Sequence, residues 1–274
     1  MTLQVTQLAL LLAAVVGAGL FAGLIAGLFG VGGGTVIVPA LFYAFGTLGL
    51  GGEGNLHTAV GTSLAVIIAV SFRSLAAHRR HGAVDEAVLR TWTPWIAVGG
   101  VVGAVLAGLS SDEGLALVYA AVALLVAAQL GFVGDRWRLA PDLPQGWARR
   151  GLGTGIGAAS AMMGVGGGAL GSMLMTLCGR PIHQAVATAS GFGLAIGVPA
   201  ALGFVVAGWD EPGRPPWSIG YVNLPAVLVM GVLTTAVAPF GARLAHRLDR
   251  NLLRRLFAAF LALTAASVAY KAWS

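Results

Sequence analysis

The sequence predicts an all-α, polytopic membrane protein made of two inverted-topology repeats, and three observations support this fold class. Of the 274 residues, 57% are hydrophobic and 9% are charged, and the mean hydropathy is +0.86. A soluble domain, in contrast, carries about 25% charged residues. The apolar residues form segments long enough to span a hydrocarbon core of about 30 Å. A glycine-rich motif also occurs twice, once in each half of the chain.

The two copies of the motif are Gly27-Leu28-Phe29-Gly30-Val31-Gly32-Gly33-Gly34 and Ala161-Met162-Met163-Gly164-Val165-Gly166-Gly167-Gly168. Consecutive glycines interrupt a helix, because each costs about 1 kcal/mol relative to alanine. At membrane depth, a broken helix is tolerated only where it is buried in protein or lines a cavity. Two such breaks at corresponding places in two halves indicate a transporter binding site.

The segments of the chain follow the same order in both halves. We expect a first repeat (1–134), a cytoplasmic connector (135–149) and a second repeat (150–274), with about eight to ten helical segments in all. The segments cover 4–29, 35–47, 57–77, 92–110, 113–133, 151–165, 168–178, 183–207, 218–240 and 252–272. The shortest are too short for an upright span, so a tilted, half-length or re-entrant helix is predicted for each.

Two further matches support the repeat. The run His57-Thr58-Ala59-Val60-Gly61-Thr62 agrees with His183-Gln184-Ala185-Val186-Ala187-Thr188 at four of six positions. Pro94 and Pro225 are predicted to open equivalent segments. The competing interpretation is a chance similarity between segments rich in alanine, valine and glycine.

The basic residues set the predicted topology. With five segments in each half and the N-terminus outside, the cytoplasmic side receives all Lys and Arg except Arg214 and Lys271. These are Arg73, Arg79, Arg80, Arg90, Arg136, Arg138, Arg149, Arg150, Arg180, Arg243, Arg247, Arg250, Arg254 and Arg255. This bias accounts for the pI near 10.4 without nucleic-acid binding. An odd number of segments inverts the second half, which suits alternating access and places His57 and His183 at opposite faces.

The acidic residues favour an anion as substrate. All ten lie in loops or at segment ends, whereas cation exchangers usually hold an acid at the membrane centre. The triglycines Gly32–Gly34 and Gly166–Gly168 each precede a short helix, and a helix N-terminus offers N–H groups to an oxyanion. The alternative role for these glycines is close helix packing.

Hydroxyl side chains and histidines complete the predicted site. The substrate-binding residues are predicted to be Gly32, Gly33, Gly34, Thr35, Thr62, Ser63, Gly166, Gly167, Gly168, Thr188 and Ser190. Their hydroxyls have an alternative partner in the carbonyl one turn earlier in the same helix. His57 and His183 are predicted to serve gating or proton coupling, because histidine titrates near neutral pH; the alternative is a histidine at headgroup level. Neither a cofactor nor a metal site is expected.

Four stretches give the chain a family resemblance. They are Gly27 to Gly34 with Val36 to Pro39, His57-x-Ala59-Val60-Gly61-Thr62-Ser63, Gly164 to Gly168, and Gly241-Ala242-Arg243-Leu244-Ala245. With these stretches, the chain resembles the TauE/SafE type of sulfite and organosulfonate exporters over nearly its whole length. The resemblance implies movement of a sulfur-containing or related small anion across the bacterial inner membrane, in the export direction. The second half departs from the pattern, since Met173 stands where the first half has Pro39.

The hypothesis is therefore a multi-pass inner-membrane anion exporter that works by alternating access and is not an enzyme. Its expected partners are a small anion and membrane lipids. Whether the chain forms a homo-oligomer is left open. One alternative is an anion channel. The other is an intramembrane serine hydrolase using Ser190 and a histidine, although Thr188-Ala189-Ser190-Gly191 lacks the first glycine of Gly-x-Ser-Gly.

Overall fold

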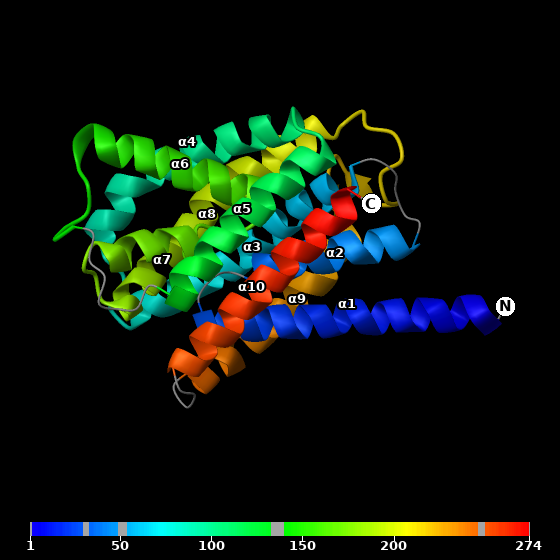
Figure 1. Ribbon diagram of the computed structural model, residues 1–274, viewed down its shortest axis with the longest axis horizontal. Helices are drawn as coiled ribbons and strands as arrows, with labels where there is room; N and C mark the ends of the chain where they lie inside the picture. The colour runs from blue at the N-terminus through cyan, green and yellow to red at the C-terminus, as the bar shows by residue number, and fades with distance from the viewer. Residues whose placement is uncertain (1, 30–32, 49–53, 133–139, 246–249, 274) are drawn as a thin grey trace.

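The computed structural model describes residues 2–29, 33–48, 54–132, 140–245 and 250–273, and these fold into ten helices and one short hairpin (Figure 1). The elements are α1 (Thr2–Phe29), α2 (Gly34–Leu48), α3 (Asn55–Arg80), α4 (Glu86–Gly108), α5 (Asp112–Phe132), α6 (Gly146–Met163), α7 (Gly168–Leu177), α8 (Ile182–Ala207), β1 (Ser218–Ile219), β2 (Val222–Asn223), α9 (Leu224–Ala245) and α10 (Arg250–Trp273). The predicted all-α polytopic class is confirmed.

Two helices, α2 and α7, are shorter than the others. Within the described residues, five helices are long and apolar enough to cross a membrane, namely α3, α4, α5, α8 and the Leu224–Gly241 part of α9. By contrast, α2 has 15 residues and α7 has 10, which at 1.5 Å per residue gives about 22 Å and about 15 Å. Both are shorter than a hydrocarbon core of about 30 Å, so the prediction of two short helices next to the glycine motifs is confirmed.

The main helix–helix contacts of the first half have counterparts in the second half. Helix α1 packs along α9, and its counterpart α6 packs along α4. The contact of α2 with α3 corresponds to that of α7 with α8, and the pairs α3–α8 and α5–α10 map onto themselves. This pattern supports the predicted repeat; its inverted orientation stays a prediction.

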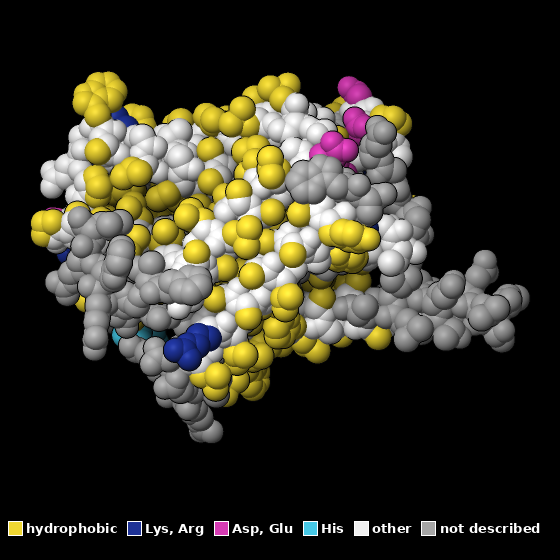
Figure 2. All heavy atoms as spheres, in the orientation of Figure 1, with side chains coloured by type: hydrophobic (Ala, Val, Ile, Leu, Met, Phe, Trp, Pro, Cys, Tyr) yellow, Lys and Arg dark blue, Asp and Glu magenta, His cyan; other side chains and the backbone are white. Residues whose placement is uncertain are grey.

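Charged and apolar side chains are separated along the long axis of the molecule. Figure 2 shows hydrophobic side chains over the middle of the visible face, Asp and Glu at its right end and Lys and Arg toward its left. Both chain termini lie at the right-hand end (Figure 1). We therefore call the end with the termini the outer end and the arginine-rich end the inner end, following the positive-inside rule.

Two predicted segment starts are wrong. Pro94 does not open its segment, because α4 begins eight residues earlier at Glu86, after the Asp85 side chain accepts a hydrogen bond from the Val88 N–H (3.1 Å). Pro225 is the second residue of α9, so the two prolines do not hold equivalent positions. A proline inside a membrane helix is tolerated because neighbouring groups satisfy the freed carbonyl.

The predicted segment 218–240 starts with a hairpin and not with a helix. Its turn residue Gly220 has a φ of 55°, a left-handed conformation that suits glycine. Helix α9 then begins at Leu224, after the Asn223 side chain accepts a hydrogen bond from the Ala226 N–H (3.0 Å). In addition, Arg73, Arg79 and Arg80 lie within α3 and not in a loop.

Many glycines serve close helix packing, most clearly where α4 crosses α6. A Cβ added to Gly99 would collide with the Thr154 carbonyl, and one added to Gly157 would collide with the Ile96 carbonyl and lie 2.9 Å from the Gly99 Cα. On the same helix as Gly157, Gly155 has nothing within 4 Å of its added Cβ. Backbone contact of this kind is how small residues pack membrane helices.

This crossing gives a matched pair of variants. We expect Gly157→Val to lower the unfolding free energy of the detergent-purified protein by about 1–3 kcal/mol or more, because overpacking here meets backbone atoms. Gly155→Val should have a much smaller effect. Thermal unfolding of both variants measures the difference, and equal transition temperatures would contradict the predicted crossing.

Candidate substrate site

The second glycine motif ends α6 by a recognised capping arrangement. Gly164 has a φ of 69°, its N–H donates to the Ala161 carbonyl (3.1 Å), and the Val165 N–H donates to the Ser160 carbonyl (3.0 Å). These two bonds form a Schellman motif, for which glycine is the preferred residue. The chain then turns, and Gly167 precedes the first residue of α7. The predicted helix break is confirmed here.

The first motif leads into α2 through Gly33. Gly33 has a φ of 76°, and its carbonyl accepts hydrogen bonds from the N–H groups of Val36 and Ile37 (3.0 Å each). The first N–H groups of any helix have no partner within the helix. Gly32 is outside the described residues.

The two motifs meet at the centre of the protein. A Cβ added to Gly34 would collide with the Gly164 carbonyl and lie 3.0 Å from the Val165 Cα. The same Gly164 carbonyl accepts a hydrogen bond from the Ser63 hydroxyl of α3 (2.7 Å). Ile67, one turn further along α3, lies against both Gly34 and Gly166. We call the contact of Gly34, Thr35, Ser63, Gly164 and Gly166 the central junction.

Thr35, in the first turn of α2, has a polar atom that the fold leaves unused. Its side chain is 1% exposed, and within the described residues its hydroxyl oxygen has no hydrogen-bond partner. Its main-chain carbonyl is bonded, because the Tyr119 hydroxyl of α5 donates to it (3.1 Å). A buried hydroxyl without a partner is costly, and Thr35 stays a predicted substrate-binding residue.

Thr62 and Thr188 both hold the start of a neighbouring helix. The Thr62 hydroxyl accepts a hydrogen bond from the Asn223 N–H, just before α9, and the Thr188 hydroxyl accepts one from the Asp85 N–H, just before α4. Each distance is 2.9 Å. The two halves thus use one contact twice, which again supports the repeat. Both hydroxyls are turned toward helix caps and away from the central junction.

The remaining predicted residues of the second half are packed among protein atoms. Added Cβ atoms on Gly166 and Gly167 would lie 2.8 Å from Ile67 and 2.7 Å from Ile196, respectively. The Gly168 carbonyl accepts a hydrogen bond from Ser172 of its own helix. The Ser190 hydroxyl donates to the Ala187 carbonyl one turn earlier (2.6 Å), the alternative role expected for a hydroxyl in an apolar helix.

His57 lies at the outer end in a buried polar cluster. Its Nδ1 is 2.5 Å from the Asp112 Oδ1 at the start of α5, and its Nε2 is 2.9 Å from the Ala107 carbonyl near the end of α4. The second oxygen of Asp112 accepts hydrogen bonds from the N–H groups of Gly54 and Leu56 at the start of α3 (3.2 and 3.3 Å). The cluster therefore fastens three helix ends together.

Tyr221, from the β hairpin, covers this cluster. Its ring centroid is 5.1 Å from that of His57. Burial, together with the negative charges of Glu211 and Asp112, raises the pKa of Tyr221 to about 12. Its phenol is therefore protonated throughout the physiological range.

At the inner end, His183 is exposed at the start of α8. The ion pairs near it belong to Arg180, whose guanidinium lies 3.2 Å from the Asp142 Oδ1 and 3.9 Å from the Asp85 Oδ2. Burial and the Asp142 carboxylate raise the pKa of the nearby Cys178 thiol, so this side chain is neutral.

Sequence reasoning missed Asp112, Tyr119, Asp85 and Asn223 as functional partners. Asp85 and Asn223 carried a readable signal, since Asp or Asn directly before an apolar run is a helix N-cap pattern. Asp112 and Tyr119 carried none, because their partners lie 55 and 84 residues away along the chain.

The long apolar helices, the broken pair at the centre and the charge separation define a multi-pass membrane transporter. The chain belongs to the sulfite exporter TauE/SafE family, whose sequence model matches residues 15–268. It is 31% identical over 264 residues to a probable membrane transporter protein of Haemophilus influenzae, covering 96% of this chain and 98% of that protein. A probable membrane transporter protein of Methanocaldococcus jannaschii is 23% identical over 262 residues, covering 92% and 93%. No solved structure matches the chain significantly.

The two threonine contacts can be tested directly. Thr62→Val leaves the buried N–H of Asn223 without an acceptor, and Thr188→Val leaves the half-buried N–H of Asp85 without one. We expect Thr62→Val to lower the unfolding free energy by about 1–3 kcal/mol, and Thr188→Val to lower it less. Thr91→Val is the control, because the exposed Thr91 hydroxyl bonds only carbonyls of its own helix. If Thr62→Val instead keeps full stability and loses substrate binding, the hydroxyl is a substrate ligand and not a helix anchor.

Proposed function

We propose that the chain is an inner-membrane exporter of a small anion, namely sulfite, an organosulfonate or a related sulfur oxyanion. It works by alternating access and is coupled to proton movement. The TauE/SafE family description supports the substrate class and the direction. The chemistry of the central junction supports an anion and not a cation, since its defining residues include no carboxylate and its side-chain polar groups are the hydroxyls of Thr35 and Ser63.

The unpartnered Thr35 hydroxyl is the observation that carries this proposal. It stands in the first turn of α2, at the positive end of the helix dipole. A sulfur oxyanion presents several acceptor oxygens, so it can take hydrogen bonds from the hydroxyl and the amides together. Hydrogen bonds to a charged group contribute about 1.5–3 kcal/mol each.

The close approach of Gly34 to the Gly164 carbonyl makes this conformation a closed one. In the proposed cycle, the anion enters when the two glycine motifs move apart, and it replaces the contact that they make with each other. Because α3 carries Ser63 and Thr62, which reach the second motif and the start of α9, a movement of α3 would separate both contacts at once. A carrier of this kind saturates with substrate, whereas an anion channel does not.

Ligand-dependent thermal stability tests the substrate class. Sulfite, thiosulfate and sulfonates should raise the unfolding temperature of the purified protein, with about 2.7 kcal/mol of stabilisation expected at a hundred times the dissociation constant. Carboxylates should have little effect. Thr35→Val should abolish most of this stabilisation without lowering the basal unfolding temperature, because no protein hydrogen bond is lost.

Thr91→Val serves again as the control and should bind like the parent protein. Stabilisation by carboxylates alone, or undiminished sulfite binding in Thr35→Val, would contradict the proposed site.

Bulky replacement of both Gly33 and Gly167 should abolish efflux of sulfite or sulfonate from loaded vesicles. Unaffected efflux would count against the role of the glycine motifs.

A further inference from the structure

The two ends of the protein are closed by different kinds of ion pair, and this inference rests on the proposed alternating-access function. We propose that His57 and Asp112 form a proton-binding site that closes the outer end. Arg180, paired with Asp142 and Asp85, closes the inner end without binding a proton. The carrier is therefore asymmetric: the outer closure depends on pH, and the inner closure does not.

With the Asp112 carboxylate ionised, the geometry of His57 fits a proton on each ring nitrogen. Nδ1 faces a carboxylate oxygen of Asp112 at 2.5 Å, and Nε2 faces the Ala107 carbonyl at 2.9 Å. Both partners are acceptors, and an imidazole that donates from both nitrogens is the cationic form. The His57 ring is buried, with 4% of its surface exposed, so water does not take the place of either bond.

The surrounding helix ends match both charges of the pair. Ala107 lies in the last turn of α4, where a helix carries partial negative charge, and Asp112 is the first residue of α5, where it carries partial positive charge. Asp112 also accepts the N–H groups of Gly54 and Leu56 from the start of α3. Its side chain is 26% exposed, which gives a proton a route from the outer surface.

Further ionisable groups near His57 lie on the hairpin and on the loop before it. Tyr221 faces the ring from the β hairpin and has a pKa of about 12. Glu211 and Arg214, on the loop before the hairpin, act on Tyr221. Histidine is the side chain whose charge ordinarily changes between about pH 5 and 8.

Loss of the proton weakens the outer closure. A neutral imidazole turns a lone pair toward either the Ala107 carbonyl or the Asp112 carboxylate, so one hydrogen bond is replaced by repulsion between two acceptors. The start of α3 then loses one of its two His57 bonds, to α4 or to α5, and stays held to α5 by the bonds of Gly54 and Leu56 to Asp112. Since α3 also holds the Gly164 carbonyl through Ser63, this weaker attachment of α3 affects the central junction as well.

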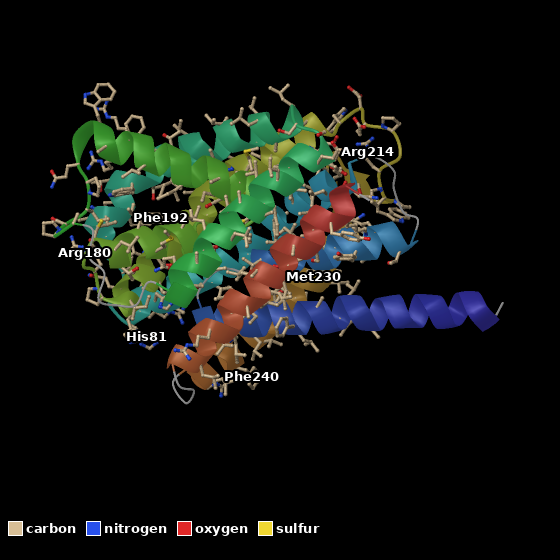
Figure 3. All side chains as sticks on the ribbon, in the orientation of Figure 1. His81, Arg180, Phe192, Arg214, Met230 and Phe240 are labelled. Atoms are coloured by element: carbon tan, nitrogen blue, oxygen red, sulfur yellow. The ribbon has the colours of Figure 1, made fainter. Side chains whose placement is uncertain are left out.

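The inner closure is made by a permanent cation. Arg180 lies at the left end of the molecule and Arg214 at the right end (Figure 3). The Arg180 guanidinium contacts Asp142 of the connector and Asp85 at the start of α4. Arginine cannot be deprotonated in proteins. Its partner Asp85 is bonded to Thr188 of α8, so this pair controls the start of α8 as His57 controls the start of α3.

Cysteine labelling of the full chain in oriented vesicles tests the proposal. In this experiment the parent is the chain with two substitutions, Cys178→Ala and Thr35→Cys. Thr35→Cys costs no hydrogen bond, because the Thr35 hydroxyl has no partner among the described residues. A membrane-impermeant charged alkylating reagent is added from one side at a time. We expect Asp112→Asn to speed outer labelling about tenfold at about pH 6, and Arg180→Gln to speed inner labelling. His57→Gln should behave like Asp112→Asn.

The pH profile separates proton binding from a purely structural role. The ratio of outer labelling in Asp112→Asn to that in the parent cancels the titration of the thiol itself. This ratio should fall toward one as the pH rises to about 9, because the parent loses its outer closure, while the inner ratio for Arg180→Gln stays constant. An outer ratio of one at low pH, or a ratio independent of pH, would overturn the proposal. Where Asp112→Asn fails to fold, His57→Gln gives the same ratio.

Substrate protection distinguishes this inference from the proposed function. Methanesulfonate, a sulfonate that does not react with thiols, is tested with a second reporter, Ala169→Cys in the first turn of α7, which keeps the Thr35 hydroxyl. It should slow the labelling of this cysteine from whichever side is open. If the labelling pattern holds but methanesulfonate gives no protection, the anion site at Thr35 is wrong and the closures stand. If methanesulfonate protects but the expected pH profile is absent, the proposed closures are wrong and the anion site stands.

Discussion

Every polar backbone group that a broken helix frees inside a membrane must find a partner within the protein, and this requirement organises the centre of the structure. Gly164 is the clearest example. Its N–H bonds the end of α6, and its carbonyl accepts the Ser63 hydroxyl. Near it, Tyr119 bonds the carbonyl of Thr35. The long helices α3 and α5 therefore supply hydroxyls to the end of α6 and to the start of the short helix α2.

The two halves share some of these polar contacts and differ in others. Thr62 and Thr188 make the same contact with the residue before a neighbouring helix. The first turn of α2, however, carries Thr35 where α7 carries Ala169, and His57 closes one end where Arg180 is placed at the other. The matched contacts belong to the scaffold, and the unmatched residues are the ones on which the proposed substrate site and the proposed closures depend.

Much of the fold followed from composition and spacing. The hydrophobic segments, the glycine breaks and the short helices after them can each be read along the chain, because they depend on local propensity and on the thickness of the membrane. The boundaries near Pro94 and Ser218 did not follow from apolar spacing alone. They are set by the helix caps Asp85 and Asn223, a pattern that the sequence carries but that apolar spacing does not show.

The sequence by itself determined that this chain crosses a membrane many times, breaks a helix in each half, and belongs to the TauE/SafE family, since these properties reside in residue types and short motifs. Only the tertiary structure decided which polar residues meet. It turned Thr62 and Thr188 toward helix caps, left the Thr35 hydroxyl free, and brought Asp112 to His57 across 55 residues. Hydrogen bonds act over about 3 Å, so a partner distant in the chain becomes visible only when the helices have packed.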